Sequence, residues 1–144
     1  MIFDRQALFS DAQAITASAA SANVYDFGPV DSSSQRKDFG KGDPTSLLIQ
    51  VVETFDSVAD DGTLNIALQL DSTTTFTPDK SIDLGTYAQA TLVAGYQIPF
   101  DKLPRGISLR YARLYYTVAG SGNFTAGKIT AGIVHGVQSN GVSI

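Results

Sequence analysis

The sequence predicts an all-β protein, specifically an antiparallel β-sandwich, and two observations support this prediction. Short runs rich in β-branched and aromatic residues recur along the 144 residues, separated by turn residues such as Asp61-Gly62. Helical periodicity is weak throughout, and Pro99 and Pro104 exclude a long helix around them. Jelly rolls, Ig-like sandwiches and lipocalin-like barrels all fit this pattern.

The clearest strands lie in the middle of the chain. Residues 45–55 are rich in β-branched residues and predict a strand, and residues 56–62 predict the loop that follows it. Residues 63–71 alternate strictly, which predicts a half-buried antiparallel strand. Its predicted inward residues are Leu64, Ile66, Leu68 and Leu70, and its predicted outward residues are Asn65, Ala67, Gln69 and Asp71.

The remaining elements are predicted from shorter patterns. We expect strands at 24–27, 81–85, 90–99, 108–118 and 123–135, with the strand at 90–99 interrupted near Gly95. Along 108–118 the apolar residues change face, so we expect a β-bulge near Ala112 and Arg113. We expect Ile129, Ala131 and Ile133 to share one face of 123–135. Residues 28–44 are predicted to be a loop, and residues 137–144 a tail.

Length and composition limit the class of protein. We expect one domain over residues 1–144, large enough to bury a core without disulfides, because the chain has no Cys. With a net charge of −4 and a pI of about 4.7, the chain has no electrostatic footprint for nucleic acid or an anionic membrane. No apolar stretch has the length of a membrane span. We therefore expect neither nucleic acid nor a membrane among its partners.

The first residues combine charge with large apolar side chains. Asp4 and Arg5 stand where a secretory signal would place its basic region and apolar core, so we expect this segment to stay in the mature protein. We treat residues 1–12 as a candidate N-terminal arm. Its apolar residues are expected to dock on a neighbouring chain, and the alternative is that the arm completes the sandwich as an edge strand. These residues are Ile2, Phe3, Leu8 and Phe9.

The same opening resembles a known family. The segment from Leu8 to Ala14, the small-residue stretch after it and the short strand Val24-Tyr25-Asp26-Phe27 resemble the start of the cement (decoration) proteins of tailed bacteriophages, of the Bordetella-phage type. The resemblance covers roughly the first fifth of the chain. It implies a jelly-roll sandwich made in the bacterial host cytoplasm and bound to the capsid surface of the virion. It implies no active site.

Residues of the types used in catalysis and metal binding do not form a recognisable motif in this sequence. His135 is the only histidine, and no Gly-x-Ser-x-Gly elbow accompanies it, so we expect no catalytic role for it. One histidine also argues against a cupin metal site. Glu53, Asp56, Asp60 and Asp61 form the densest acidic cluster, but their spacing does not match a calcium loop and favours turn formation. We expect no cofactor and no required metal.

One aromatic and basic patch is a candidate for binding a partner. Tyr111, Tyr115 and Tyr116 alternate with Arg110 and Arg113 along a single predicted strand. Tyr and Arg are enriched at interface hot spots, although strands favour aromatic residues in any case. With the four apolar residues of the arm, we select Arg110, Arg113 and Tyr115 as candidate partner-binding residues.

Two functions from different classes remain open. The first is a non-enzymatic virion protein that bridges major capsid protein subunits, as a homo-oligomer of two or three copies. The second is a carbohydrate-binding, lectin-like sandwich, against which the lack of Trp and the poor calcium match count mildly. An enzyme is a weaker third interpretation, because no catalytic constellation is visible.

Overall fold

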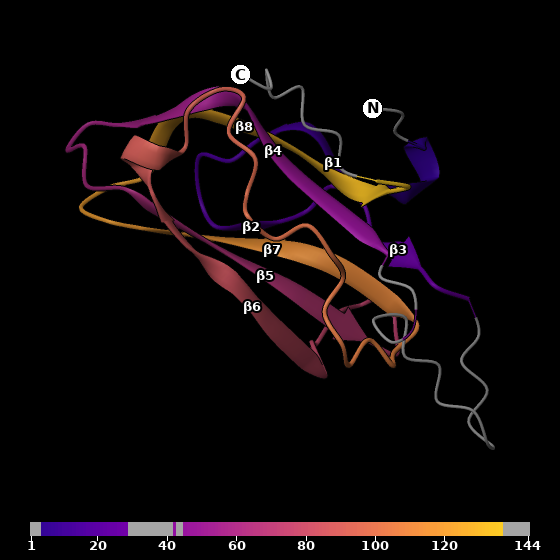
Figure 1. Cartoon of the computed structure of the whole chain (residues 1–144). Coiled ribbons are helices and arrows are strands. Elements are labelled where there is room, and N and C mark those ends of the chain that lie inside the picture. Colours follow the sequence, from indigo (N-terminus) through magenta and orange to yellow (C-terminus); the bar gives the residue numbers. More distant parts are fainter. Residues whose placement is uncertain (1–3, 29–41, 43–44, 137–144) are drawn as a thin grey trace, which may run out of the picture.

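The computed structural model describes residues 4–28, 42 and 45–136, which fold into two antiparallel β-sheets packed face to face (Figure 1). The first sheet has the order β1-β8-β4, with β1 at Leu8–Ala14, β4 at Ser46–Ser57 and β8 at Phe124–Val134. The second has the order β2-β7-β5-β6, and β3 also pairs with β7. Its strands are β2 Ala19–Ala20, β3 Tyr25–Asp26, β5 Thr63–Asp71, β6 Lys80–Ala88 and β7 Tyr111–Ala119. The predicted all-β antiparallel sandwich is confirmed.

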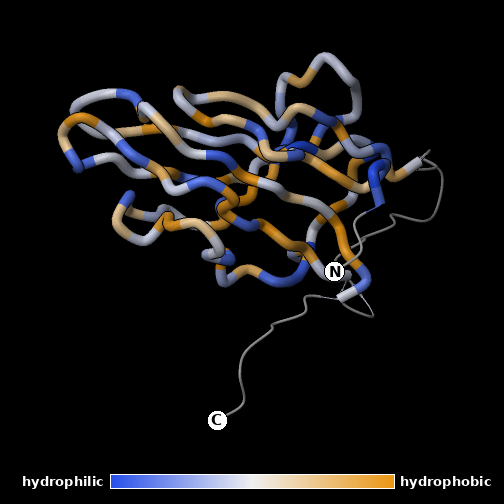
Figure 2. Tube along the Cα trace, turned by 90° about the horizontal axis from the view of Figure 1, so that it is seen from above, coloured by the Kyte–Doolittle hydropathy of each residue, from blue (hydrophilic) through white to orange (hydrophobic). Residues whose placement is uncertain are grey.

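The core lies between the two sheets and follows the alternation seen in the sequence. Leu64, Ile66, Leu68 and Leu70 of β5 are completely buried, as predicted. Ile49 and Val51 of β4 and Ile129 and Ala131 of β8 face them from the other sheet, and all belong to one hydrophobic cluster. Figure 2 shows hydrophobic and hydrophilic residues alternating along the strands. Burying each such side chain contributes about 1.5–3 kcal/mol, so this cluster is the main source of stability.

Strand β7 keeps one phase along its whole length, so the bulge predicted near Ala112 and Arg113 is wrong. All nine residue pairs between β5 and β7 follow each other without a register shift. The strand begins only at Tyr111, and Ile107 is buried from the preceding loop, where Gly106 has a φ of +95°. The apparent change of face arose because loop residues were counted as part of the strand.

The other strands agree with the prediction in part. Strand β8 lies within the predicted 123–135, β4 runs two residues past the predicted 45–55 into the predicted loop, and β6 is longer than the predicted 81–85. The register between β5 and β6 shifts next to Gly85, whose φ is +118°, and leaves Leu84 without a counterpart on β5. Only Tyr25 and Asp26 of the predicted strand 24–27 pair. The tail 137–144 lies outside the described residues, as does most of the loop 28–44.

Residues 90–99 do not form the predicted strand. They begin in the 3-10 helix η2 (Gln89–Thr91) and continue as an irregular segment. This segment extends to residue 103 and runs along the edge of β4 that no other described strand pairs with. Backbone N–H groups of Leu47, Val51 and Phe55 donate to carbonyls of this segment at 2.9–3.0 Å. Regular pairing is interrupted because Gly95 turns with a φ of +90° and Pro99 has no N–H to donate.

Other parts of the chain therefore hydrogen-bond to both edges of the three-stranded sheet. On the β1 side, Asn23 donates its backbone N–H to the Phe9 carbonyl at 2.9 Å and its side-chain amide to the Leu8 carbonyl at 3.2 Å. Within the described residues no helix has the length and apolarity needed to cross a membrane.

Candidate interaction surface

The start of the chain is part of the domain's own sandwich. Arg5–Ala7 form the 3-10 helix η1, and β1 follows it directly as the edge strand of the three-stranded sheet. Phe9 is fully buried in the main core, and Leu8 is buried against β8. The expectation that Leu8 and Phe9 dock on a neighbouring chain is therefore wrong, and the edge-strand alternative holds for them. Ile2 and Phe3 lie outside the described residues.

The strand β1 is also joined to the opposite sheet by buried polar groups. The hydroxyls of Ser10 and Tyr116 lie 2.8 Å apart in the core, and the Ser10 hydroxyl donates to the Gln13 side chain. Gln13 in turn accepts the Ala22 N–H at 2.7 Å. This chain of hydrogen bonds satisfies polar groups that would be costly to bury alone. It gives the N-terminal segment an internal, structural role.

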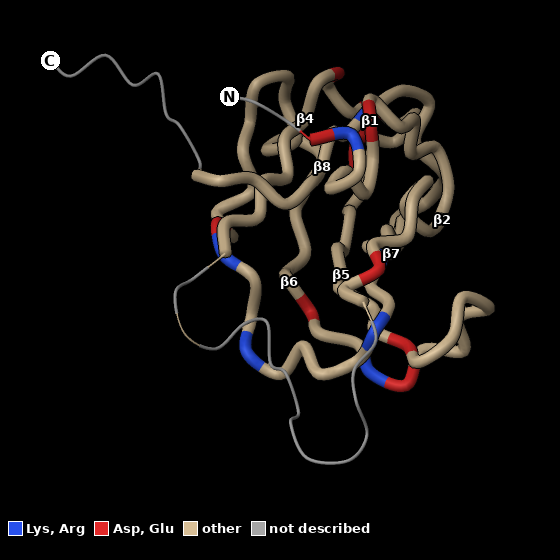
Figure 3. Tube along the Cα trace, turned by 90° about the vertical axis from the view of Figure 1, so that its right-hand side faces the viewer, with Lys and Arg blue, Asp and Glu red and all other residues tan. Residues whose placement is uncertain are grey.

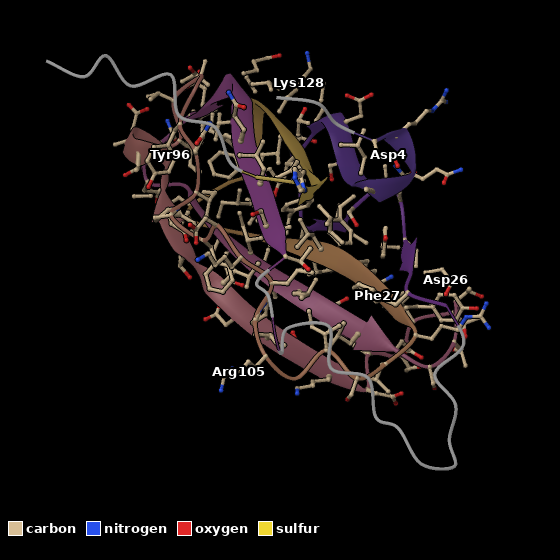
Figure 4. All side chains as sticks on the ribbon, turned by 45° about the vertical axis from the view of Figure 1, so that its right-hand side comes forward. Asp4, Asp26, Phe27, Tyr96, Arg105 and Lys128 are labelled. Carbon is tan, nitrogen blue, oxygen red and sulfur yellow. The ribbon has the colours of Figure 1, made fainter. Side chains whose placement is uncertain are left out.

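Arg110 lies at one corner of the molecule, where it pairs with Asp26 of β3. Two parallel hydrogen bonds of 2.8 Å join its Nε and terminal nitrogen to the two carboxylate oxygens. This bidentate contact lowers the pKa of Asp26 and raises the pKa of Arg110. Figure 4 shows Asp26 at the periphery, and both side chains are about 40% exposed. The pair ties β3 to the start of β7, so the Arg110 charge is already neutralised.

Arg113 lies on the outer face of the five-stranded sheet. Its Nε donates to Gln69 Oε1 on the neighbouring strand β5 at 2.8 Å. Its guanidinium carbon lies 4.3 Å from the centre of the Phe76 ring and 5.9 Å from the centre of the Tyr115 ring. We call these four residues, Arg113, Gln69, Phe76 and Tyr115, the Arg113 platform. The structure thus brings Arg113 and Tyr115 together and separates them from Arg110.

Two members of this platform were not selected from the sequence. Gln69 was predicted to point outward from its strand. Its position opposite Arg113 follows only from the register of β5 against β7, which the sequence does not give. Phe76 lies in the Thr-rich loop after β5, where no periodic pattern gives a face. It has a φ of +45° and is 8% exposed, but it is outside the main core cluster.

The acidic cluster in the last part of β4 and the turn after it is held by polar contacts within the protein. The Gln89 amide donates to Asp60 at 3.1 Å, and the Ser121 hydroxyl and backbone N–H donate to the Asp61 carboxylate. These bonds lower the pKa of Asp61. The described residues contain no group of three or more His, Asp or Glu side chains arranged to hold a metal. Asp60 and Asp61 join the turn after β4 to η2 and to the loop after β7.

His135 lies in a bend directly after β8 and is exposed. A separate cleft of about 590 Å³ lies between η1, β1 and β3 and is lined by Arg5, Asp11, Asn23, Val24 and Asp26, among others. Its lining is mostly polar, and Val24 is its one strongly exposed apolar residue among the described ones. His135 is not among the residues that line it.

Charge on the described surface is sparse and mixed in sign, as Figure 3 shows. Apart from Arg110 with Asp26, the ion pair between described residues joins Lys128 of β8 to Glu53 of β4 across the outer face of the three-stranded sheet. Neither sheet therefore carries a broad field of one sign. Recognition by such a surface depends on individual side chains and shape.

Comparison with known proteins identifies a family. Residues 9–133 match the model of the Bbp16 family, a family of Bordetella phage proteins. No curated protein matches the chain. The matched range runs from Phe9 in β1 to Ile133 in β8, so it includes both sheets and the Arg113 platform. Because the match spans most of the 144 residues, the chain belongs to the Bbp16 family of phage proteins.

Proposed function

We propose that this protein is a non-enzymatic virion protein that binds the outside of the phage capsid and bridges major capsid protein subunits. The observation that carries the proposal is the Bbp16 family match over residues 9–133. The resemblance of the first residues to phage cement proteins supports the same role and indicates the capsid as the partner.

The internal packing and hydrogen bonding of the described side chains also support a structural role. The large apolar residues of both sheets pack into one core, and polar groups such as Asp56, Asp60 and Asp61 connect its own loops. Both edges of the three-stranded sheet accept or donate hydrogen bonds to other segments of the same chain. A rigid body of this kind transmits force between the subunits that it touches, because its interior is close-packed.

A rigid protein that contacts several capsid subunits at once can bridge them. Once one contact with the shell forms, the next forms at high effective concentration, so modest individual affinities hold the subunits together. Two neighbouring capsid subunits then separate only if the contacts of the bridging protein break as well. We propose that a small oligomer, a dimer or trimer, multiplies the contacts further.

Co-sedimentation with empty heads tests the proposal. Heads are assembled from the phage's major capsid protein without this chain, purified and mixed with increasing amounts of the purified protein. We expect saturable binding at a fixed number of copies per capsid subunit. No co-sedimentation above that of an unrelated acidic β-sandwich of similar size would refute the proposed function.

A further inference from the structure

Arg113 is held in one orientation by its neighbours on the outer face of the five-stranded sheet. The hydrogen bond from Nε to Gln69 fixes one edge of the guanidinium, and the Phe76 ring at 4.3 Å covers one of its faces. Tyr115 lies two residues further along the same face of β7. A guanidinium that is already oriented loses less side-chain entropy when it binds a ligand.

Among the described residues, no hydrogen bond or ion pair engages the two terminal nitrogens of Arg113. Within residues 4–28, 42 and 45–136, the Arg113 side chain hydrogen-bonds to Gln69 alone and forms no ion pair. Arg110 and Lys128 differ from it, because carboxylates within 2.8 Å neutralise both. Arg113 is therefore a half-buried cation whose terminal donors face no acceptor of the described chain.

The nearest carboxylate by strand register does not change this conclusion. Asp71 shares the outer face of β5 with Gln69 and is 3% exposed. Its Oδ1 accepts both the backbone N–H and the hydroxyl of Thr73, while its Oδ2 has no hydrogen-bond partner. Among the described residues no ion pair joins Asp71 to Arg113, and the two hydrogen bonds to Oδ1 hold the carboxylate against its own loop.

The position and chemistry of Arg113 define what it can bind. Strand β7 lies inside the five-stranded sheet, between β5 on one side and β2 and β3 on the other. The platform is therefore central on this face, and the half-buried Tyr111 lies beside it on the same face of β7. A planar fork of two terminal nitrogens beside aromatic rings matches a carboxylate bidentately and is typical of interface hot spots.

We propose that the Arg113 platform is a docking point that binds an Asp or Glu side chain of a protein partner. The proposal rests on the proposed function, so the partner is the outer surface of the capsid shell. A phosphate backbone is a poorer match, because nucleic acid binding needs several cations in a row and this chain has a net charge of −4. The single oriented guanidinium instead suits one carboxylate within a mostly neutral contact.

Binding of two arginine variants to undecorated heads tests the docking point. Arg113→Gln removes the charge and the fork, and Arg113→Lys keeps the charge but removes the fork. Arg105→Gln is the matched control, because Arg105 is an exposed arginine in the loop before β7 and lies outside the platform (Figure 4). We expect a dissociation constant about 10- to 100-fold weaker for Arg113→Gln, an intermediate loss for Arg113→Lys, and no more than about a twofold change for Arg105→Gln.

The outcomes separate this inference from the proposed function. If the wild-type protein binds heads and Arg113→Gln binds them equally well, the docking point is wrong and the proposed function stands. If the wild-type protein does not bind heads at all, both fail. Retention of the wild-type protein, but not of Arg113→Gln, on carboxylated glycans without any binding to heads would overturn the protein partner.

A cross-linking experiment keeps the inference testable if Arg113→Gln does not fold. Tyr115 is replaced by the photo-reactive amino acid benzoylphenylalanine, and the decorated heads are irradiated and analysed by mass spectrometry. We expect cross-links to a capsid protein peptide that contains an Asp or Glu close to the linked residue. Cross-links confined to other copies of this chain, or to a capsid peptide without a carboxylate, contradict the proposal.

Discussion

Tyr116 shows how a single polar residue is accommodated in the core. It is the largest of the fully buried side chains, and its hydroxyl is bonded to Ser10 of the opposite sheet at 2.8 Å. Burial raises the pKa of this phenol above its ordinary value of 10.0, because the charged phenolate would lose its solvation. The same burial makes the protonation state of Tyr116 a contributor to stability.

The unfolding free energy should therefore fall at high pH. Above about pH 10 the unfolded chain releases the Tyr116 proton while the folded chain keeps it, so stability is complete below the unfolded pKa and is lost as the pH rises. This group contributes a slope of up to about 1.4 kcal/mol per pH unit. Urea unfolding between pH 7 and pH 11 measures it, and Tyr116→Phe should show a clearly shallower decline. An equal decline in both proteins would contradict this role of Tyr116.

Leu68 tests the core in the same way. It is fully buried at the centre of β5, so Leu68→Ala should lower the unfolding free energy by about 2–5 kcal/mol. Val52→Ala is the control, because Val52 is 42% exposed on β4 and should change stability by less than about 1 kcal/mol. Chemical denaturation of both variants gives the comparison. Similar losses for the two would mean that the Leu64–Leu70 face is not the core.

The strands show which elements could be predicted from the sequence. Strand β5 was predicted to its last residue because both of its faces are regular. The segment after η2 was not, because its apolar residues Leu92 and Ile98 are buried without a continuous hydrogen-bond ladder. Alternating apolar residues indicate which side chains are buried. A side chain can be buried without its backbone pairing with a neighbouring strand. The bulge assigned to β7 failed for a related reason, since the sequence does not mark where a strand begins.

The irregular segment that covers β4 leads to a prediction about hydrogen exchange. The backbone N–H groups of Leu47, Val51 and Phe55 donate to Asp101, Tyr96 and Leu92. We expect these three amides to exchange as slowly as those of a central strand, because opening them requires the whole segment to detach. Exchange measured by NMR tests this, and rapid exchange typical of a free sheet edge would show that the segment does not cover β4 in solution.

A glycine in β8 explains how this strand passes close to the core aromatic residues. Gly127 has a φ of +136°, and a Cβ there would lie 2.4 Å from the Phe55 ring. Gly127→Ala should therefore destabilise the protein by about 1–3 kcal/mol or more, through both strain and overpacking. In Gly122→Ala the new methyl group meets nothing within 4 Å, so a much smaller change in melting temperature is expected. Equal melting temperatures of the two variants would contradict this account.

At the scale of the whole molecule, the sequence identified the class of fold and part of the candidate surface. Arg113 and Tyr115 were found from their residue types, but Gln69 and Phe76 come from other segments and were placed only by sheet register and loop path. Leu8 and Phe9 suggested a docking arm, because they are large apolar residues near an end of the chain. They instead complete the core, because β1 has a place beside β8.

Reinforcement of the capsid, which we propose for this Bbp16-family protein, can be measured on phage heads themselves. The most direct measurement is the temperature at which purified heads lose their integrity, with and without saturating amounts of the protein, followed by light scattering or by release of packaged DNA. We expect decorated heads to fail at a clearly higher temperature than bare heads, and the increase to follow the fraction of sites occupied. Heads that bind the protein at full occupancy but fail at the temperature of bare heads would contradict it.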